Sequence, residues 1–149
     1  MDPVQVWSSR VTQTFATDEE ISASAPAAPR ILIVEDDFLV ASQLVAGLTN
    51  AGFDVIGVAM STDEAIAMAR SEHPALAIVD IRLAGHRDGV EVAIELFREH
   101  GIRSIFTTAY ADPETRQRAQ AAAPLAWLAK PYSPDRLGPL IRAALARKG

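Results

Sequence analysis

Carboxylates directly follow two strongly apolar runs of this sequence. Asp80 comes straight after Leu-Ala-Ile-Val, and the acidic triplet at 35–37 comes straight after Ile-Leu-Ile-Val. A short, continuous apolar run is typical of a strand that is buried on both faces. Burying a charge at the end of such a strand costs free energy unless something compensates it. Both positions are therefore candidates for a site at which a cation offsets the negative charge.

Two more polar groups follow later apolar runs in the same way. Thr108 follows Ser-Ile-Phe-Thr, and Lys130 follows Ala-Trp-Leu-Ala. If these runs form neighbouring parallel strands, their carboxyl ends meet at one edge of the sheet, where open α/β sheets bind ligands. The pocket would then contain several carboxylates, a hydroxyl and an ammonium group. Clustered carboxylates suit a hard divalent cation, typically Mg²⁺ with several bound waters.

This combination of groups can perform phosphoryl transfer. An ionised Asp80 can attack a phosphorus atom, because carboxylates form covalent aspartyl phosphates. Lys130 and the hydroxyl of Thr108 can stabilise the phosphoryl oxygens. Each feature alone has a more ordinary explanation, because acidic triplets are usually solvated turns or helix caps, Lys-Pro is usually a surface turn, and Asp80 can cap a loop. Their occurrence together, at the ends of successive strands, favours the functional interpretation.

The elements that position these groups alternate between strand and helix. We predict strands at 30–34, 53–59, 75–80, 102–108 and 125–130, and helices at 38–52, 61–74, 88–101, 112–123 and 133–149. Strands separated by helices pair in parallel, because a parallel neighbour requires a crossover connection. The right-handed crossover rule then gives an α/β fold: a five-stranded parallel sheet, doubly wound in the flavodoxin-like manner, with helices on both faces. Gly138 and Pro139 predict an irregular start to the last helix.

The 149-residue chain has the size of one domain, and its composition argues against several classes of protein. Its net charge of −5 disfavours nucleic-acid binding, which usually needs a basic surface. The sequence has no cysteine for a disulfide or thiolate metal site, no apolar run long enough for a membrane helix, and no signal peptide. We therefore expect a cytoplasmic protein that binds neither nucleic acid nor a membrane.

Residues 1–29 differ from the rest of the chain. They are rich in Ser, Thr, Ala and Pro and show no sustained hydrophobic period. This composition predicts a flexible arm, and the folded domain then spans 30–149. A short strand or a docking segment around Trp7 is the alternative for the start of the arm.

Four ordered motifs resemble the receiver domains of two-component response regulators. They are ILIVEDD, AIVDIRL, FTTAY and WLAKPY, and the resemblance covers residues 30–147. It implies a signalling module rather than an enzyme, with Mg²⁺ as cofactor and a histidine kinase, a phosphotransfer protein or a small molecule such as acetyl phosphate as the donor. The FTTAY stretch is also loosely similar to the FATGY stretch of the FAT GUY group of stand-alone receivers, from which it differs at two positions.

The resemblance implies a role for each acidic residue of the pocket. Asp80 matches the aspartate that accepts the phosphoryl group. Asp36 and Asp80 would bind Mg²⁺ directly, and the backbone carbonyl of Arg82 would be a further ligand. Glu35 would act mainly through water, and Asp37 would lie outside the ligand set.

The resemblance also identifies the groups that would respond to phosphorylation. Thr108 matches the switch hydroxyl, and the small Ala109 leaves the approach to the phosphoryl group open. Lys130 matches the lysine that contacts the phosphoryl group, with a cis peptide bond to Pro131. Trp127 occupies the position of the switch aromatic, which is usually Tyr or Phe.

By the same resemblance, phosphorylation would change the face built from residues 112–123, 125–130 and 133–149, and this change would be the output signal. The helix at 112–123 is polar, as expected of an element that moves. A downstream protein would bind this face, and a homodimer is possible. Because no output domain follows the last helix, we expect a stand-alone regulator. Arg82 and Tyr110 would flank the pocket and tune hydrolysis of the aspartyl phosphate.

Two alternatives remain open. A phosphatase of the haloacid dehalogenase type also combines a nucleophilic Asp with Mg²⁺ and a Lys, but it needs a second Asp two residues later, where this chain has Arg82. The other is a receiver-like interaction module that works without phosphorylation. Thr108, Lys130 and the intact acidic pair argue against it. The loop after Leu83 keeps it open, because this loop lacks the usual Met-Pro and is one residue longer than the common pattern.

Overall fold

The computed structural model describes residues 27–83 and 88–148. Its strands and helices are β2 (Arg30–Val34), α2 (Phe38–Asn50), β3 (Asp54–Ala59), α3 (Thr62–Glu72), β4 (Leu76–Asp80), α4 (Gly89–His100), β5 (Ser104–Thr108), α5 (Pro113–Ala119), the 3₁₀ helix η1 (Gln120–Ala122), β6 (Ala126–Ala129) and α6 (Pro134–Lys148). The arm predicted at 1–29 falls outside the described residues except for its last three positions. The centre of the unusual loop, 84–87, also lies outside them.

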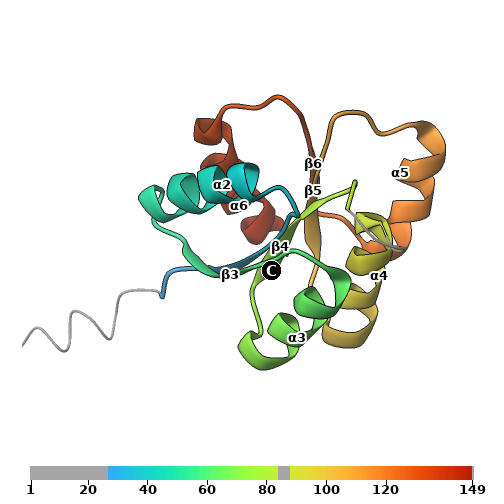
Figure 1. Cartoon of the computed structure of the whole chain (residues 1–149), viewed down its shortest axis with the longest axis horizontal. Helices are drawn as coiled ribbons and strands as arrows, with labels where there is room; N and C mark the ends of the chain where they lie inside the picture. Colours follow the sequence, from blue (N-terminus) through green and yellow to red (C-terminus); the bar gives the residue numbers. More distant parts are fainter. Residues whose placement is uncertain (1–26, 84–87, 149) are drawn as a thin grey trace, which may run out of the picture.

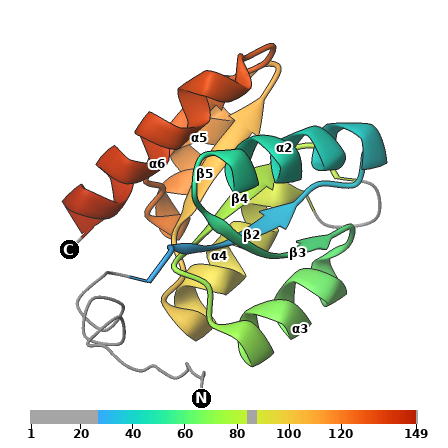
Figure 2. The same cartoon turned by 90° about the vertical axis from the view of Figure 1, so that its left-hand side faces the viewer.

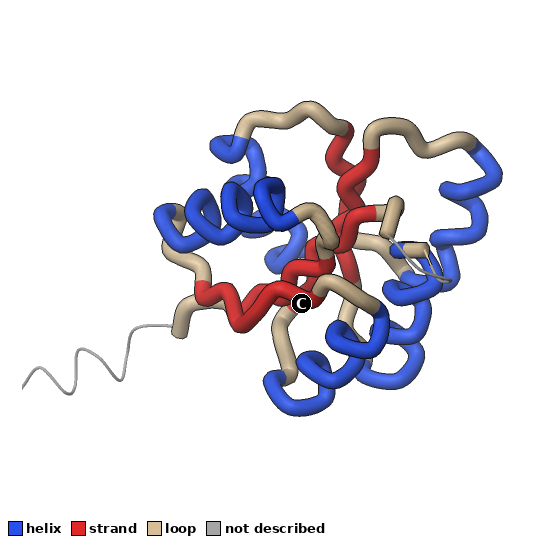
Figure 3. Tube along the Cα trace, in the orientation of Figure 1, coloured by secondary structure: helices blue, strands red, loops and turns tan. Residues whose placement is uncertain are grey.

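The strands, red in Figure 3, belong to one sheet. They are parallel, in the order β3-β2-β4-β5-β6. β2 therefore lies inside the sheet, with β3 at one edge. The later strands β4, β5 and β6 follow in sequence toward the other edge. The predicted doubly wound α/β fold is confirmed. The point at which the order reverses lies between β2 and β4, so the ends of these two strands border the crevice in which such sheets bind ligands.

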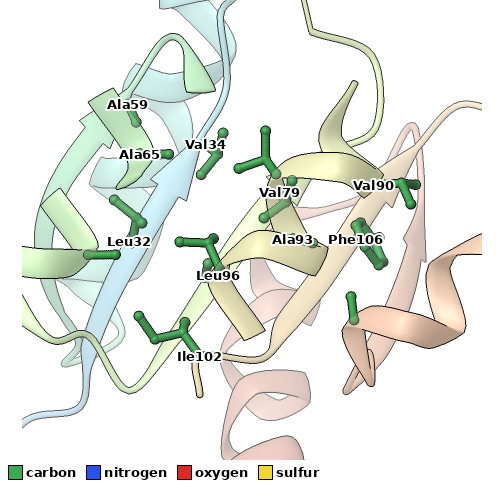
Figure 4. Close-up of a cluster of buried hydrophobic side chains, with 14 of the residues drawn as sticks. Leu32, Val34, Ala59, Ala65, Val79, Val90, Ala93, Leu96, Ile102 and Phe106 are labelled. Atoms are coloured by element: carbon green, nitrogen blue, oxygen red, sulfur yellow. The ribbon is translucent and has the colours of Figure 1, made fainter. Parts of the chain in front are cut away.

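Helices cover both faces of the sheet (Figures 1 and 2). Helices α2 and α6 pack on one face, over a core that includes Ile33 and Ile78. Helices α3, α4 and α5 lie on the other face, over a core that includes Leu32 and Phe106. Figure 4 shows how side chains of the second core meet between α4 and the strands. Strands β4 and β5 are buried at every residue, which explains why their sequences read as uninterrupted apolar runs.

Side-chain caps fix where the helices begin. The N-cap residues are Asp37 for α2, Ser61 for α3, Asp88 for α4 and Asp112 for α5, and each accepts a hydrogen bond from a backbone N–H of the first turn. Such a cap contributes about 1 kcal/mol to the stability of a helix. The loops that end at these caps leave the carboxyl edge of the sheet, so the caps also set the geometry of that edge.

The last helix differs from the prediction, because α6 runs without interruption through Gly138 and Pro139. Pro139 is exposed and lies in the second turn, where the one hydrogen bond that it forgoes is the bond to the carbonyl of Asp135. Gly138 is buried, and a Cβ atom there would lie 3.4 Å from Cβ of Ala51. This is an ordinary van der Waals distance, so α6 lies beside the residue that caps the end of α2.

The helix predicted at 112–123 is shorter than expected. It divides into α5 and η1, and each of them buries a single residue, Ala119 and Ala122. The polar character read from the sequence thus corresponds to an element with few buried anchors. Among the described helices, none combines the length and the apolar character that crossing a membrane requires.

Candidate functional site

Asp80 lies at the carboxyl end of the central strand β4 and is 6% exposed. Its Oδ1 atom accepts a hydrogen bond of 3.2 Å from the backbone N–H of Arg82. Its Oδ2 atom lies 3.3 Å from Nζ of Lys130. The ammonium group and the N–H dipole offset part of the cost of burying this carboxylate.

Glu35 directly follows β2 and is 2% exposed. Its Oε2 atom accepts a hydrogen bond from the backbone N–H of Asp37, whereas Oε1 is buried without a hydrogen-bond partner. Nζ of Lys130 is 3.8 Å from Oε1, too far for a hydrogen bond. Burial raises the pKa of Glu35 to about 7, and the nearby charge of Asp80 adds to this rise, against the opposing effects of the Asp37 N–H and Lys130.

Glu35, Asp36 and Asp80 form one acidic cluster. A carboxylate oxygen of each lies within 4.8 Å of an oxygen of both others. Among the described residues, the ammonium group of Lys130 lies near two members of this cluster, Glu35 and Asp80. An all-oxygen donor set with an unpartnered buried oxygen fits a hard divalent cation. Asp37 points elsewhere, because its side chain caps α2 and is exposed.

Thr108 ends β5 and is 5% exposed. Its hydroxyl donates a 2.8 Å hydrogen bond to the backbone oxygen of Tyr110 and accepts a 3.1 Å bond from the N–H of the same residue. The hydroxyl is therefore bound to the loop that follows β5. Ala109 is exposed beside it, and the Tyr110 side chain is 75% exposed. Movement of the hydroxyl toward Asp80 would have to break both bonds to Tyr110.

The end of β6 holds Lys130 against its neighbours. The backbone N–H of Lys130 donates a 2.8 Å hydrogen bond to the carbonyl of Thr108, which ties the two strand ends together. The peptide bond between Lys130 and Pro131 is cis, as the resemblance implied. The chain turns away from the sheet at this point, and α6 begins three residues later.

Trp127 lies within β6 and is half-buried. Its ring centroid is 4.8 Å from that of Phe106, at an interplanar angle of 35°. The guanidinium carbon of Arg116, on α5, lies 4.4 Å from a ring centroid of the same side chain. The indole is therefore in contact with the buried Phe106 and with a cation of α5.

The structure leaves one predicted metal ligand untested. The backbone N–H of Arg82 contacts Asp80, and its side chain is exposed. A role for the Arg82 carbonyl as a metal ligand stays a prediction. In sum, Glu35, Asp36, Asp80 and Lys130 come together at the carboxyl edge, whereas Thr108 borders this group and Trp127 lies farther along β6 on the path to α5.

A largely apolar cavity of about 480 Å³ opens beside Lys130. Its walls come from the first half of α2 and from the loops after β5 and β6, and the lining residues are Val40, Gln43, Leu44, Ala109, Lys130, Pro131 and Tyr132. Phe38 and Leu39, at the start of α2, are strongly exposed for large apolar side chains. The surface beside Lys130 is thus apolar on the side of α2.

Sequence reasoning missed two residues of the site. Burial, together with the charges of Glu35 and Asp80, raises the pKa of Tyr132 to about 12, so its hydroxyl stays protonated beside the acidic cluster. Its place two residues after Lys130 was the available signal. A Cβ atom on Gly89 would lie 2.0 Å from the carbonyl oxygen of Asp80, so only glycine fits there. The Asp-Gly pair before the third predicted helix was visible, but the close approach was not.

Comparison with known proteins identifies the family. Residues 31–142 match the model of the response regulator receiver domain. The transcriptional regulatory protein PdtaR of Mycobacterium tuberculosis is 31% identical over 131 residues, which cover 88% of this chain and 63% of PdtaR. The phyllosphere-induced regulator PhyR of Methylorubrum extorquens is 36% identical over 123 residues, which cover 82% of this chain and 45% of PhyR. The chain thus spans less than two thirds of the length of these relatives.

Solved structures agree with this result. The signal receiver domain of a modulated diguanylate cyclase from Desulfovibrio desulfuricans G20 is 41% identical, with a TM-score of 0.76, and the match covers 81% of this chain and 96% of that domain. A CheY-like receiver domain protein from Methanospirillum hungatei is 29% identical, with a TM-score of 0.75 and the same coverage of both chains. The chain belongs to the response regulator receiver family, which is a family of signalling modules and not of enzymes.

Proposed function

We propose that this receiver accepts a phosphoryl group on Asp80 with the help of Mg²⁺. The observation that carries the proposal is the acidic cluster with Lys130 at the carboxyl edge, in which Oε1 of Glu35 is buried without a hydrogen-bond partner. Clustered carboxylates repel one another, so their gathering at a strand edge is destabilising by itself and supports a cation-binding role.

In the transfer step, a carboxylate oxygen of Asp80 attacks the phosphorus atom. The bond between phosphorus and the donor breaks, and the donor keeps the bonding electron pair; when the donor is phosphohistidine, this is the P–N bond. Lys130, 3.3 Å from Asp80, would move onto a phosphoryl oxygen. Bound Mg²⁺ would neutralise charge on the phosphoryl oxygens, with Asp36, Asp80 and the Arg82 carbonyl as direct ligands and Glu35 acting mainly through water.

Phosphorylation would then shift a two-state equilibrium. The hydroxyl of Thr108 leaves Tyr110 for a phosphoryl oxygen, and Trp127 repacks in response. The face built from α5, β6 and α6 changes, and a downstream protein or a second copy of the chain reads the change. Arg82 and Tyr110, beside the pocket, tune the hydrolysis of the aspartyl phosphate.

The donor would approach over the apolar cavity beside Lys130. Phe38 and Leu39, at the start of the helix that contributes to this cavity, are exposed. A histidine kinase or phosphotransfer protein that presents an apolar surface around its phosphohistidine fits this side of the receiver. In this proposal the receiver occupies residues 30–149, and residues 1–29 form a separate arm.

Titration with beryllofluoride, a phosphoryl mimic, tests the proposal. The Trp7→Phe variant leaves Trp127 as the one indole, so its fluorescence reports on the site. We expect saturable, Mg²⁺-dependent binding that is lost in Asp80→Asn and retained in the matched variant Asp37→Asn, because Asp37 lies outside the cluster. If Asp80→Asn binds beryllofluoride as the parent does, or if the parent does not bind it, the receiver works without phosphorylation.

A further inference from the structure

Two arginines of α5 contact two different elements of the domain. Arg118 pairs with Asp88 at the start of α4, and Arg116 lies over Trp127 of β6. These contacts stand out because α5 buries only Ala119. Much of what fixes the position of this helix therefore comes from side chains at its surface.

The two carboxylate oxygens of Asp88 accept hydrogen bonds from different helices. Oδ1 accepts the N-cap hydrogen bond from the N–H of Glu91, and Oδ2 accepts a 2.8 Å hydrogen bond from the guanidinium of Arg118. Partial burial works to raise the pKa of Asp88, but the bonds from Arg118 and from the helix N–H groups outweigh it and lower the pKa. The same pairing raises the pKa of Arg118. The pair is therefore ionised at neutral pH.

Gly89 connects this pair to the candidate phosphorylation site. Its N–H donates a 2.8 Å hydrogen bond to the carbonyl of Ile81, and its Cα packs directly against the carbonyl of Asp80. The N-cap of α4 therefore cannot shift without disturbing the end of β4. Arg118 thus ties α5 to the strand that carries Asp80.

Arg116 connects α5 to the strand that carries the switch hydroxyl. It lies over Trp127, and Trp127 packs on Phe106, which is two residues before Thr108 on β5. A ring of contacts thus runs from β4 through α4, α5 and β6 to β5. The ring closes at the carboxyl edge of the sheet, where β4 and β5 are neighbours. The proposed function places Asp80 of β4 and Thr108 of β5 on either side of the phosphoryl group.

We propose that Arg116 and Arg118 form a latch that holds α5 in the arrangement seen here, and that phosphoryl capture at Asp80 must break this latch to move the helix. The second half of the proposal rests on the proposed function. The effect of each contact is small, because exposed ion pairs and exposed cation–π contacts each change an equilibrium by about two- to fivefold. These contacts still determine the position of α5, because this helix has few buried contacts that could hold it in their place.

Amide hydrogen exchange of residues 116–120, without any phosphoryl mimic, tests the holding role. Arg118→Gln and Asp88→Asn should each speed this exchange about threefold. Asn still caps α4, so Asp88→Asn removes the charge of the pair and spares the helix start. The double variant should exchange no faster than either single variant, because both remove the same interaction. Arg116→Gln should have an independent effect of similar size.

Arg98→Gln is the matched control, since Arg98 is an exposed arginine of α4 outside the ring of contacts. It should leave the exchange of α5 unchanged. Raising the salt concentration should speed exchange in the wild type and have less effect in Arg118→Gln, because salt screens an exposed pair. Unchanged exchange in both Arg118→Gln and Arg116→Gln would overturn the latch.

Beryllofluoride affinity tests the coupling to the phosphorylation site. If the latch opposes activation, Arg116→Gln and Arg118→Gln should each bind the mimic about threefold more tightly than the wild type, and Arg98→Gln should not. Unchanged affinity in both variants would refute the coupling. If the wild type binds no beryllofluoride, the proposed function fails, and hydrogen exchange alone then decides whether the two arginines hold α5.

Discussion

At the scale of single residues, the site brings three acidic side chains close together. Asp80 has two partners, Lys130 and a backbone N–H, whereas Glu35 has one oxygen that is buried without a hydrogen-bond partner. The protein keeps these groups close because the strand ends that carry them are neighbours in the sheet. The cost of this arrangement in the metal-free protein is measurable through the pH dependence of stability.

The metal-free protein should become less stable as the pH rises from about 4.5 to about 7, as far as Glu35 determines the change. Burial raises the pKa of this carboxyl from 4.5 to about 7 in the folded protein. Within this interval the folded state holds a proton that the unfolded state releases, so the free energy of unfolding falls as the pH rises. Chemical denaturation in a chelating buffer at about pH 5 and about pH 7.5 measures the change.

Glu35→Gln is the comparison for this measurement, because the amide has a similar shape and does not titrate. The variant should lose less stability than the wild type between the two pH values. Titrating groups far from the site contribute equally to both proteins, so the difference between them reports on Glu35 together with the groups that interact with it, Asp80 and Lys130. Equal losses in the two proteins would show that the Glu35 carboxyl is not perturbed by burial.

At the scale of elements, the sequence was sufficient for the order and type of the described strands and α-helices, but not for the short 3₁₀ helix η1 that follows α5. The apolar runs marked β4 and β5 because both are buried on two faces, and the Ser and Asp caps marked helix starts. The irregular start predicted for α6 was wrong. A glycine and a proline weaken a helix locally, but Leu137, Ile141 and Ala144 bury α6 in the core, and local patterns do not reveal these tertiary contacts.

Part of the candidate site could likewise be predicted from the sequence, and part could not. The grouping of Glu35, Asp36 and Asp80 followed from strand order, since β2 and β4 are adjacent and residues at the carboxyl ends of adjacent parallel strands must be close. Lys130 follows β6, one strand farther away across β5, and its long side chain reaches Asp80. The orientation of the Thr108 hydroxyl toward the backbone of the next loop did not follow, because it depends on a rotamer. The contacts of the α5 arginines were equally hidden, because they join elements distant in the sequence.

Gly89→Ala should be strongly destabilising, by roughly 3 kcal/mol or more, because its Cβ would overlap the backbone of Asp80 and force α4 away from β4. Gly101→Ala is the matched control. It places a methyl group at a positive φ of 69° but in open space, so it should cost only about 1 kcal/mol. Urea denaturation compares the two variants. Equal and small losses would show that the close approach of α4 to Asp80 is absent in solution.

At the scale of the whole molecule, one sheet joins the site to the proposed output face. Strands β4, β5 and β6 are consecutive in the sheet, and each contributes a residue to the site or to the path toward α5. A cation that binds the acidic cluster would contact residues at the ends of two neighbouring strands, β2 and β4, and would join them at the centre of this sheet. Its effect should appear in the global stability and not only at the site.

Mg²⁺ should raise the melting temperature of the wild type, because a ligand that binds only the folded state stabilises it by mass action. The increase should disappear or fall sharply in Asp36→Asn, which removes a carboxylate of the cluster. It should persist in Asp37→Asn, which makes the same chemical change one residue away and keeps a side chain able to cap α2. An equal Mg²⁺ response in the two variants would place the cation elsewhere.

The most direct measurement of the central claim is the mass of the protein after incubation with acetyl phosphate and Mg²⁺, followed by mapping of the modified residue. We predict the addition of one phosphoryl group on Asp80, its dependence on Mg²⁺, and its absence from Asp80→Asn. A phosphoryl group that persists in Asp80→Asn, or a wild type that stays unmodified while a known receiver is labelled under the same conditions, would contradict the account.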